Sequence, residues 1–223
     1  MGNLTQLADV KTILQIPSSD TSQDALINLV IPAVSAQIES YCNRTFGVAS
    51  YTENLPPSNS TVLQLQNWPI TTVTSVTADG SAMVAGQDYY LYSQFVSSGQ
   101  LYREPGWYGK MIGRGLTFDP VQPMITIAVV YNAGYNLPGV TPVAGASNLP
   151  LNIQLSAMQM TAKVVELSNS GNLGENIQSI SEGAESRTFE NPAKIPSDMF
   201  SQISGMPIQF ALLLNPFKKI GCA

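Results

Sequence analysis

The segment from Tyr102 to Gly115 is the one stretch of the chain in which basic and aromatic side chains alternate. A base or a sugar ring stacks on exposed aromatic rings, while arginine and lysine side chains meet phosphates. The segment is therefore a candidate for binding a glycan or a single-stranded nucleic acid. The alternative, which the acidic balance of the chain favours, is a hairpin whose aromatic rings pack on a sheet. The residues of this candidate partner loop are Arg103, Trp107, Tyr108, Lys110 and Arg114.

Four glutamates lie between residues 171 and 190, where Arg187 is the one basic residue. Two carboxylates can serve as acid and base in glycoside hydrolysis. Glu182 and Glu185 are three residues apart, but they lie in a glycine-containing segment, which favours a solvated acidic surface over catalysis. The candidate acidic loop consists of Glu175, Glu182, Glu185 and Glu190.

The end of the chain combines an apolar helical pattern with a proline, an aromatic residue and two lysines. Apolar anchors followed by a charged tip are typical of a segment that docks on another protein. The alternative is that the same residues close the core of their own domain. The residues of this candidate docking tail are Phe210, Leu212, Leu213, Leu214, Pro216, Phe217, Lys218 and Lys219.

The chain contains no histidine and only two cysteines, Cys42 and Cys222. The lack of imidazole excludes Ser-His-Asp and Cys-His nucleophiles and every zinc site that needs histidine. Two cysteines are too few for a four-thiolate site, and their spacing matches no redox motif. We therefore expect no catalytic residues, no metal site and no cofactor, and a protein that is not an enzyme.

Charged residues make up 11% of the 223 residues, less than half of the usual share. The net charge of -5 argues against a protein whose main role is to neutralise phosphates. Ser, Thr, Asn and Gln account for 68 residues, so the surface is polar mainly through neutral groups, which cost less to desolvate than charges. This composition indicates extensive protein contacts; the alternative is an ordinary neutral surface. We also expect no signal peptide and no membrane partner.

Proline divides the chain, with two in residues 1–50, nine in 51–150 and four in 151–223. Apolar spacing predicts helices over 6–15, capped by Thr5, and over about 21–41, with a capping box at Thr21 and Asp24 and with Pro32 inside. Further helices are expected over 150–167, after Pro196 and over 208–214.

The middle of the chain changes to a period of two, which is typical of strands. Strands are expected at 62–65, 71–76 and 89–92, with Asp79-Gly80 as a hairpin turn. The run 124–131 is apolar enough for a strand that is buried on both faces. The sequence therefore predicts an α+β fold. Two N-terminal helices, one long central helix and short C-terminal helices form a helical bundle framework, and a mostly antiparallel β-sheet region is inserted into it. Its parts, 1–50, 51–149 and 150–223, are expected to form one composite domain.

Five stretches, taken in order, resemble the head-tail connector proteins of tailed bacteriophages, which are also called adaptors. They are the opening helix pair at 7–33, its closing pattern Tyr41-x-x-Arg44-x-Phe46, the strand exit 130–135 leading to 149–151, the segment 177–189, and the ending 213–219.

This resemblance implies a structural component of the virion neck, assembled in the host cytoplasm. It implies a homo-oligomeric ring, commonly of twelve subunits, that joins the portal protein to a stopper or tail-completion protein and lets viral DNA pass through its centre. The docking tail would then meet the portal. The alternative function is a virion-associated module that binds a glycan or single-stranded nucleic acid through the candidate partner loop.

Overall fold

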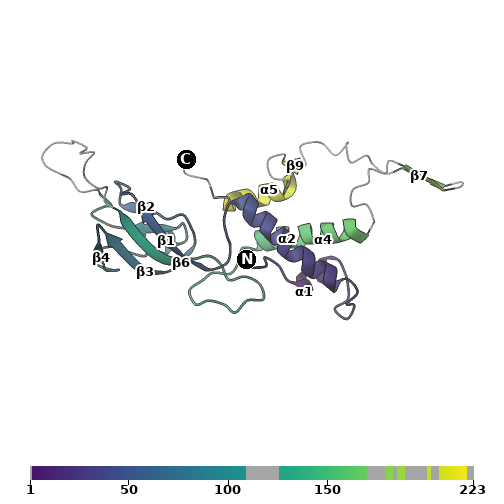
Figure 1. Cartoon of the computed structure of the whole chain (residues 1–223), viewed down its shortest axis with the longest axis horizontal. Helices are drawn as coiled ribbons and strands as arrows, with labels where there is room; N and C mark the ends of the chain where they lie inside the picture. Colours follow the sequence, from purple (N-terminus) through teal and green to yellow (C-terminus); the bar gives the residue numbers. More distant parts are fainter. Residues whose placement is uncertain are drawn as a thin grey trace. The chain divides into compact units, whose positions relative to one another are not determined.

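The computed structural model describes residues 2–108, 126–169, 179–182, 185–188, 200–201 and 206–219 (Figure 1). By contacts the chain divides into a helical unit, Met1–Thr45, Leu137–Gly139 and Leu149–Ala223, and a β unit, Phe46–Asn136 and Val140–Asn148. The described elements are α1 (Leu7–Ile13), α2 (Asp24–Cys42), β1 (Ala49–Leu55), β2 (Val62–Gln64), β3 (Ile70–Ala78), β4 (Ser81–Met83), α3 (Ser93–Val96), β5 (Gln100–Tyr102), β6 (Ile127–Ala133), α4 (Leu151–Asn169), β7 (Ser179–Glu182), β8 (Glu185–Thr188), β9 (Phe200–Ser201), β10 (Met206–Pro207), α5 (Ile208–Leu214) and the 3-10 helix η3 (Asn215–Phe217).

The predicted α+β class is confirmed, with a mostly antiparallel sheet inserted between N-terminal and C-terminal helices. The expected helix after Pro196 falls largely outside the described residues, and Phe200–Ser201 within it form β9. The expected strand at 89–92 is reduced to single bridges at Tyr89 and Tyr90, because α3 begins at Ser93.

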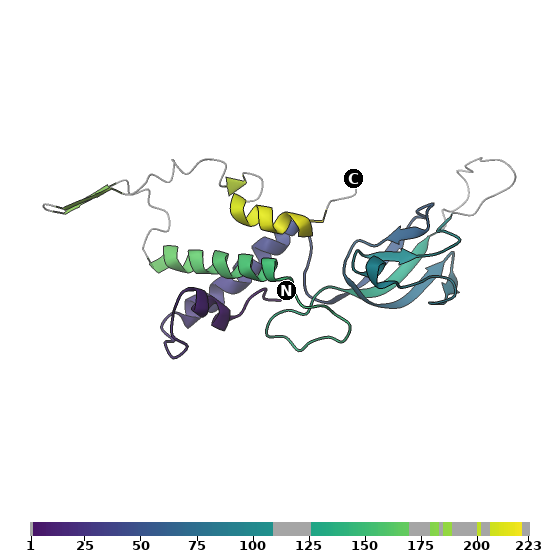
Figure 2. The same cartoon turned by 180° about the vertical axis from the view of Figure 1, so that it is seen from behind.

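In the helical unit, α2 and α4 lie side by side, and α1 and α5 pack against α4 (Figure 2). The apolar face of α2 fits the predicted stripe, and the helix continues through Pro32. Leu4 is fully buried, and its backbone N–H donates to Ser35 Oγ at 3.0 Å, which fixes the N-terminal segment on α2. The core of this unit consists of Leu4, Val10, Ile27, Ile31, Val34, Ile38, Cys42, Ile153, Ala157, Val165, Phe210 and Leu214.

The predicted caps of the first two helices are wrong. Gln6 is the N-cap of α1, whereas Thr5 is buried. Gln23 is the N-cap of α2, and no side chain caps either helix. Asp24 makes no capping box because its carboxylate faces Lys11 instead.

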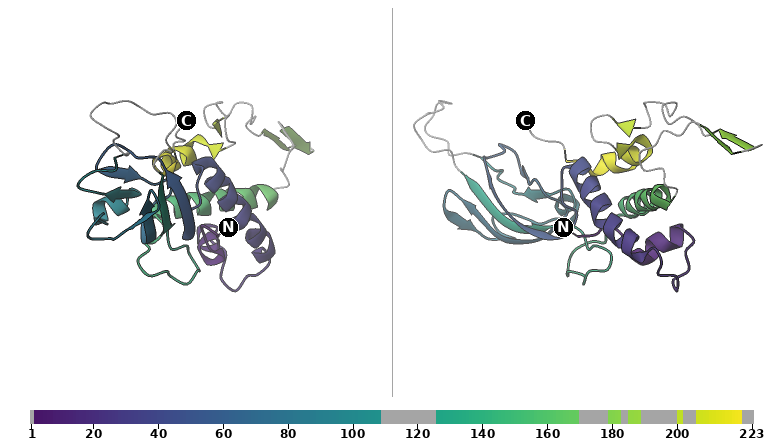
Figure 3. Two further views of the ribbon diagram at one scale, coloured as in Figure 1. Left: turned by 60° about the vertical axis from the view of Figure 1, so that its left-hand side comes forward. Right: turned by 45° about the vertical axis from the view of Figure 1, so that its right-hand side comes forward.

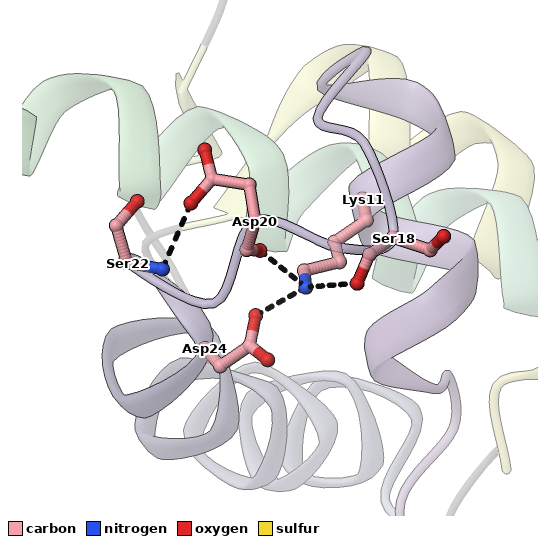
Figure 4. A network of polar contacts seen from close by, with 5 residues as sticks. All are labelled: Lys11, Ser18, Asp20, Ser22 and Asp24. Carbon is pink, nitrogen blue, oxygen red and sulfur yellow. Dashed lines mark hydrogen bonds and ion pairs between the residues drawn. The ribbon is translucent and has the colours of Figure 1, made fainter.

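Lys11 connects α1 to the start of α2 (Figure 4). Its ammonium group lies 2.5 Å from the Asp24 carboxylate and donates to the backbone carbonyl of Asp20 at 2.7 Å and, more weakly, to that of Ser18. The Lys11 side chain is 6% exposed, so its charge depends on these oxygens rather than on water. A buried lysine thus fixes the turn between the helices.

The β unit contains a four-stranded antiparallel sheet with the order β1-β6-β3-β4 (Figure 3). Along the central strand β6, buried and half-buried residues alternate. The expectation that this strand is buried on both faces is therefore only half right: Ile127, Val129, Tyr131 and Ala133 are buried, and the other face is half exposed. β2 and β5 form a separate antiparallel pair.

Two turns in the β unit need glycine. Asp79 and Gly80 both have positive φ, 52° and 77°, between paired residues Ala78 and Ser81, so the predicted two-residue hairpin is confirmed. Gly134 follows β6 with φ 129°, and a Cβ there would lie 2.5 Å from the carbonyl oxygen of Gly47. The strand exit can therefore hold only glycine at this position.

The core of the β unit surrounds Trp107 and Tyr131, which are both fully buried. The Tyr131 hydroxyl donates to the Glu53 carboxylate on β1, and Asn67 donates to the same hydroxyl. Burial, followed by the hydrogen bond to Glu53, raises the pKa of Tyr131 well above its usual value. The core consists of Leu63, Leu65, Ile70, Val76, Tyr89, Leu101, Trp107, Ile127, Val129, Tyr131 and Ala133.

Among the described helices, α2 alone has the length and hydropathy that a membrane span would need. Half of its apolar window is buried inside the unit, and the core helix of a globular protein passes the same test.

Replacing Asp24 with Asn should lower the free energy of unfolding by about 2 kcal/mol, because the buried Lys11 ammonium group loses its counter-charge. Urea unfolding followed by circular dichroism measures this change. The matched control is Glu166→Gln, which removes a pair to Lys163 whose side chains are 65% and 59% exposed, and it should cost less than about 0.5 kcal/mol. Equal losses in both variants would contradict the proposed role of Lys11.

Candidate functional site

Helix α4 is apolar on most of its circumference, and its buried face changes along its length. In the first half the buried apolar residues are Ile153, Ala157 and Met160, and in the second half they are Ala162 and Val165. These two sets belong to different stripes of the helix. Because the buried face changes, the apolar residues that extend the first stripe into the second half of the helix are exposed. The apolar residues that extend the second stripe into the first half are exposed as well.

The exposed continuations form two patches. Leu151 and Leu155, the leucine patch, are 78% and 40% exposed, and Val164 and Leu167, the valine–leucine patch, are 37% and 39% exposed. At about 100° per residue the two patches point to roughly opposite sides of α4. A single exposed leucine needs no explanation, but two pairs on one central helix are unusual and make the two patches candidate contact surfaces.

The structure divides the candidate docking tail into buried and exposed residues. Phe210 and Leu214 are 5% and 0% exposed and belong to the core of the helical unit, so they cannot act as anchors for another protein. They are buried because α5 packs on α4. Leu212 is 67% exposed and Leu213 is 37% exposed. Pro216 and Lys218 are also exposed, and Phe217 and Lys219 are half-buried.

Contacts with the end of α2 hold the tail in place. The Tyr41 hydroxyl donates to Asn215 Oδ1 at 2.7 Å, and the backbone N–H of Lys219 donates to the carbonyl of Cys42 at 2.8 Å. The Lys218 ammonium group lies 4.6 Å from the centre of the Tyr41 ring, within the range of a cation–π contact. The tail is therefore fixed on the unit while Leu212 and Leu213 remain exposed.

The candidate partner loop is corrected by the position of Trp107. Its indole is fully buried and donates from Nε1 to the carbonyl of Leu101 at 3.2 Å, so it cannot stack on a ligand. The Arg103 guanidinium lies 5.7 Å from the centre of the same ring. Tyr108 is 53% exposed, and Lys110 and Arg114 lie outside the described residues. The alternative in which this tryptophan packs in the β unit is the correct one.

The candidate acidic loop lies partly on the hairpin of β7 and β8. Glu182 and Glu185 are opposite each other at its turn. Glu175 and Glu190 lie outside the described residues.

One group of aromatic residues was not identified as a candidate site from the sequence. Tyr90, Tyr92, Phe95 and Tyr102 contact one another in the β unit, and Tyr92 is 45% exposed. A signal was present, because residues 89–102 contain five aromatic residues and no charge. The alternating pattern of this segment predicted a strand. Periodicity does not show which aromatic rings from separate turns contact one another.

Acidic and sulfur-containing side chains do not cluster as metal ligands anywhere in the described part of the chain. Cys42 is buried as a free thiol, and burial raises its pKa to about 11. Cys222 lies outside the described residues.

Comparison with known proteins gives one family. A family model described as "Head completion protein" matches residues 3–160. No curated protein matches the chain significantly.

Three solved structures of gene transfer agent (GTA) particles are similar in part. The neck of an empty particle gives 14% identity, coverage of 97% of this chain and 90% of the other, and a TM-score of 0.47. A chain of the native virion gives 15% identity, coverage of 97% and 89%, and a TM-score of 0.45. The neck of the native particle gives 14% identity, coverage of 100% and 96%, and a TM-score of 0.45.

The thiol of Cys42 should resist modification while the protein is folded. With a pKa of about 11, only about 0.1% is thiolate at pH 8, compared with roughly 10% for a thiol of pKa 9. In a Cys222→Ser variant, labelling by a disulfide reagent at pH 8 should therefore be at least about a hundredfold slower in buffer than in urea. Rapid labelling of the folded variant would show that Cys42 is accessible.

Proposed function

Because the chain belongs to the head completion protein family, we propose that it is a non-enzymatic ring component of the virion neck, located between the portal and the stopper or tail. The family assignment confirms the predicted kinship with phage head-tail connector proteins and indicates a structural role in virion assembly. We propose further that twelve subunits form the ring, that the ring contacts the portal protein and the stopper or tail-completion protein, and that viral DNA passes through its centre.

The two exposed patches of α4 are the observation that carries this proposal. A closed ring of identical subunits uses two different surfaces on each subunit, one for each neighbour. The leucine patch and the valine–leucine patch are two such surfaces, and both are apolar. In the ring, Leu151 and Leu155 of one subunit pack against Val164 and Leu167 of the next.

The charge of the chain supports a DNA channel. A channel that DNA must leave freely should not bind phosphates, and a subunit with a net charge of -5 repels them. We propose that the candidate acidic loop, which includes Glu182 and Glu185 at paired positions of β7 and β8, faces the channel or the tail.

The docking tail supports attachment to the portal. Leu212 and Leu213 are exposed on α5, and the contacts of Tyr41 with Asn215 and Lys218 fix their position. A prepositioned anchor loses little conformational entropy on binding, and a ring repeats it in every subunit.

Two pairs of substitutions test the ring. Each fully buried leucine contributes about 1.5–3 kcal/mol, so Leu151→Gln with Leu155→Gln should prevent ring closure. Val164→Gln with Leu167→Gln should do the same on the other patch. Mixing the two variants should produce heterodimers and nothing larger, because one intact interface remains between them. Mass photometry with and without purified portal measures the species.

The control for this test is Gln159→Ser, which changes an exposed polar residue of α4 and should leave the ring intact. Rings formed by both double variants would contradict the proposal. So would homodimers of either double variant, because they would indicate a symmetric interface instead of head-to-tail contacts.

Leu212→Ser together with Leu213→Ser should weaken portal binding by at least about tenfold without lowering the melting temperature, because both side chains are exposed. Binding to immobilised portal and thermal unfolding are measured on the same samples. Phe210→Ala is the matched control: it removes a buried ring and should cost about 3 kcal/mol of stability. Unchanged portal affinity of the double variant would exclude α5 as the docking surface.

A further inference from the structure

Four aromatic rings form a cluster on the β unit beside the β2–β5 pair. Tyr90 stacks on Tyr92 with centroids 5.6 Å apart and planes 7° apart, and Phe95 stacks on Tyr102 at 5.5 Å and 4°. Tyr92 joins the two pairs, with its centroid 6.1 Å from Phe95 and 5.7 Å from Tyr102. We call these four residues the tyrosine cluster.

The tyrosine cluster is not part of the core of the β unit. Side chains alternate between the two faces of a strand, and Tyr89 and Leu101 point into the core next to Trp107. Tyr90 and Tyr102, their immediate neighbours, therefore face the opposite side. Tyr92 is 45% exposed and the adjacent Leu91 is 41% exposed. The four rings thus pack on one another at the surface and add little to the packing of the interior.

Backbone hydrogen bonds hold together the segments that carry the four rings. Tyr90 and Tyr102 exchange two backbone hydrogen bonds, at 2.7 and 3.2 Å. The carbonyl of Tyr92 accepts from the N–H groups of Phe95 and Val96 at the start of α3. Rings that are fixed before binding lose little entropy when a ligand arrives.

The polar groups around the cluster are neutral. Gln64 and Gln100 lie on paired strands beside it, and Gln100 Nε2 donates to Gln64 Oε1 at 2.9 Å. Gln64 Nε2 in turn donates to the carbonyls of Leu65 and Ser98, so the Gln64 amide is already hydrogen-bonded within the unit. No charged residue occurs from Tyr89 to Tyr102. Among the described residues, no hydrogen bond involves the hydroxyls of Tyr90, Tyr92 or Tyr102.

Charge argues against a nucleic acid as this ligand. Single-stranded nucleic acids need basic side chains along the stacking surface. Over residues 46–136 and 140–148 the sequence has three basic residues against five acidic ones, so this unit is acidic on balance. The Arg103 guanidinium lies over Trp107.

Area argues against a protein partner. Four rings of about 200 Å² each, less than half exposed, offer roughly 400 Å² at most. One partner of a stable protein complex contributes about 800 Å². The surface is therefore the size of a ligand site rather than of a protein interface.

We propose that the tyrosine cluster binds a neutral glycan. The C–H faces of a sugar ring pack on the electron-rich faces of tyrosine rings, and its hydroxyls exchange hydrogen bonds with tyrosine hydroxyls and the Gln100 amide. A neutral sugar needs no counter-charge, which fits the absence of charge from this segment. This inference does not rest on the proposed ring, although repetition in an assembly would strengthen a weak site through avidity.

Titration of the full chain with neutral pentasaccharides of glucose, galactose, mannose and N-acetylglucosamine tests the proposal. Binding is followed by isothermal titration calorimetry and by tyrosine fluorescence, at low and high salt. At least one pentasaccharide should bind with an affinity that salt does not change. Tyr92→Ala should weaken this binding by about tenfold or more, whereas Tyr92→Phe should retain most of it, since the ring face remains.

Val140→Ser is the control, because Val140 is 57% exposed in the same unit and belongs neither to the cluster nor to the candidate partner loop. It should leave the affinity unchanged, and melting curves confirm that all variants are folded. The proposal is overturned if none of the pentasaccharides binds, or if binding survives Tyr92→Ala. It is also overturned if the protein binds oligothymidylate at low salt and Tyr92→Ala abolishes that binding.

Discussion

Burial of α4 is the constraint on which the rest of the helical unit depends. This helix carries apolar residues around most of its circumference, and α1, α2 and α5 cover only one face at each level. The covered face changes half-way along the helix, so that Leu151 and Leu155 are exposed on one side and Val164 and Leu167 on the other. Within the described residues, these four side chains form two exposed apolar patches on roughly opposite sides of the helix.

The end of the chain depends on the end of α2. Asn43 ends this helix in the left-handed conformation, and the next backbone N–H, that of Arg44, bonds back to Glu39. The turn places Tyr41 and Cys42 where they contact Asn215, Lys218 and Lys219. Two patterns that resemble phage connectors, at opposite ends of the chain, are therefore in contact. These contacts fix the position of α5 relative to the end of α2.

The two units both have few charged residues, but they expose different kinds of uncharged side chain. In the helical unit the exposed groups of interest are aliphatic, which suits permanent burial between subunits. In the β unit they are tyrosines and amides, which suit a ligand that exchanges with water. Both uses are easier with few lysines and glutamates nearby, since desolvating a charge costs more than desolvating a neutral polar group.

The sequence by itself determined the fold class, the positions of the long helices, the Asp79-Gly80 hairpin and the family, because periodicity, turn chemistry and ordered motifs are local properties. The buried face of α4, the burial of Phe210, Leu214 and Trp107, and the meeting of Tyr90, Tyr92, Phe95 and Tyr102 were decided by the tertiary structure. An apolar stripe shows that a residue can be buried, but not which neighbour covers it. The caps at Thr5 and Thr21 failed for the same reason: packing buried Thr5, and Lys11 on another helix took the Asp24 carboxylate.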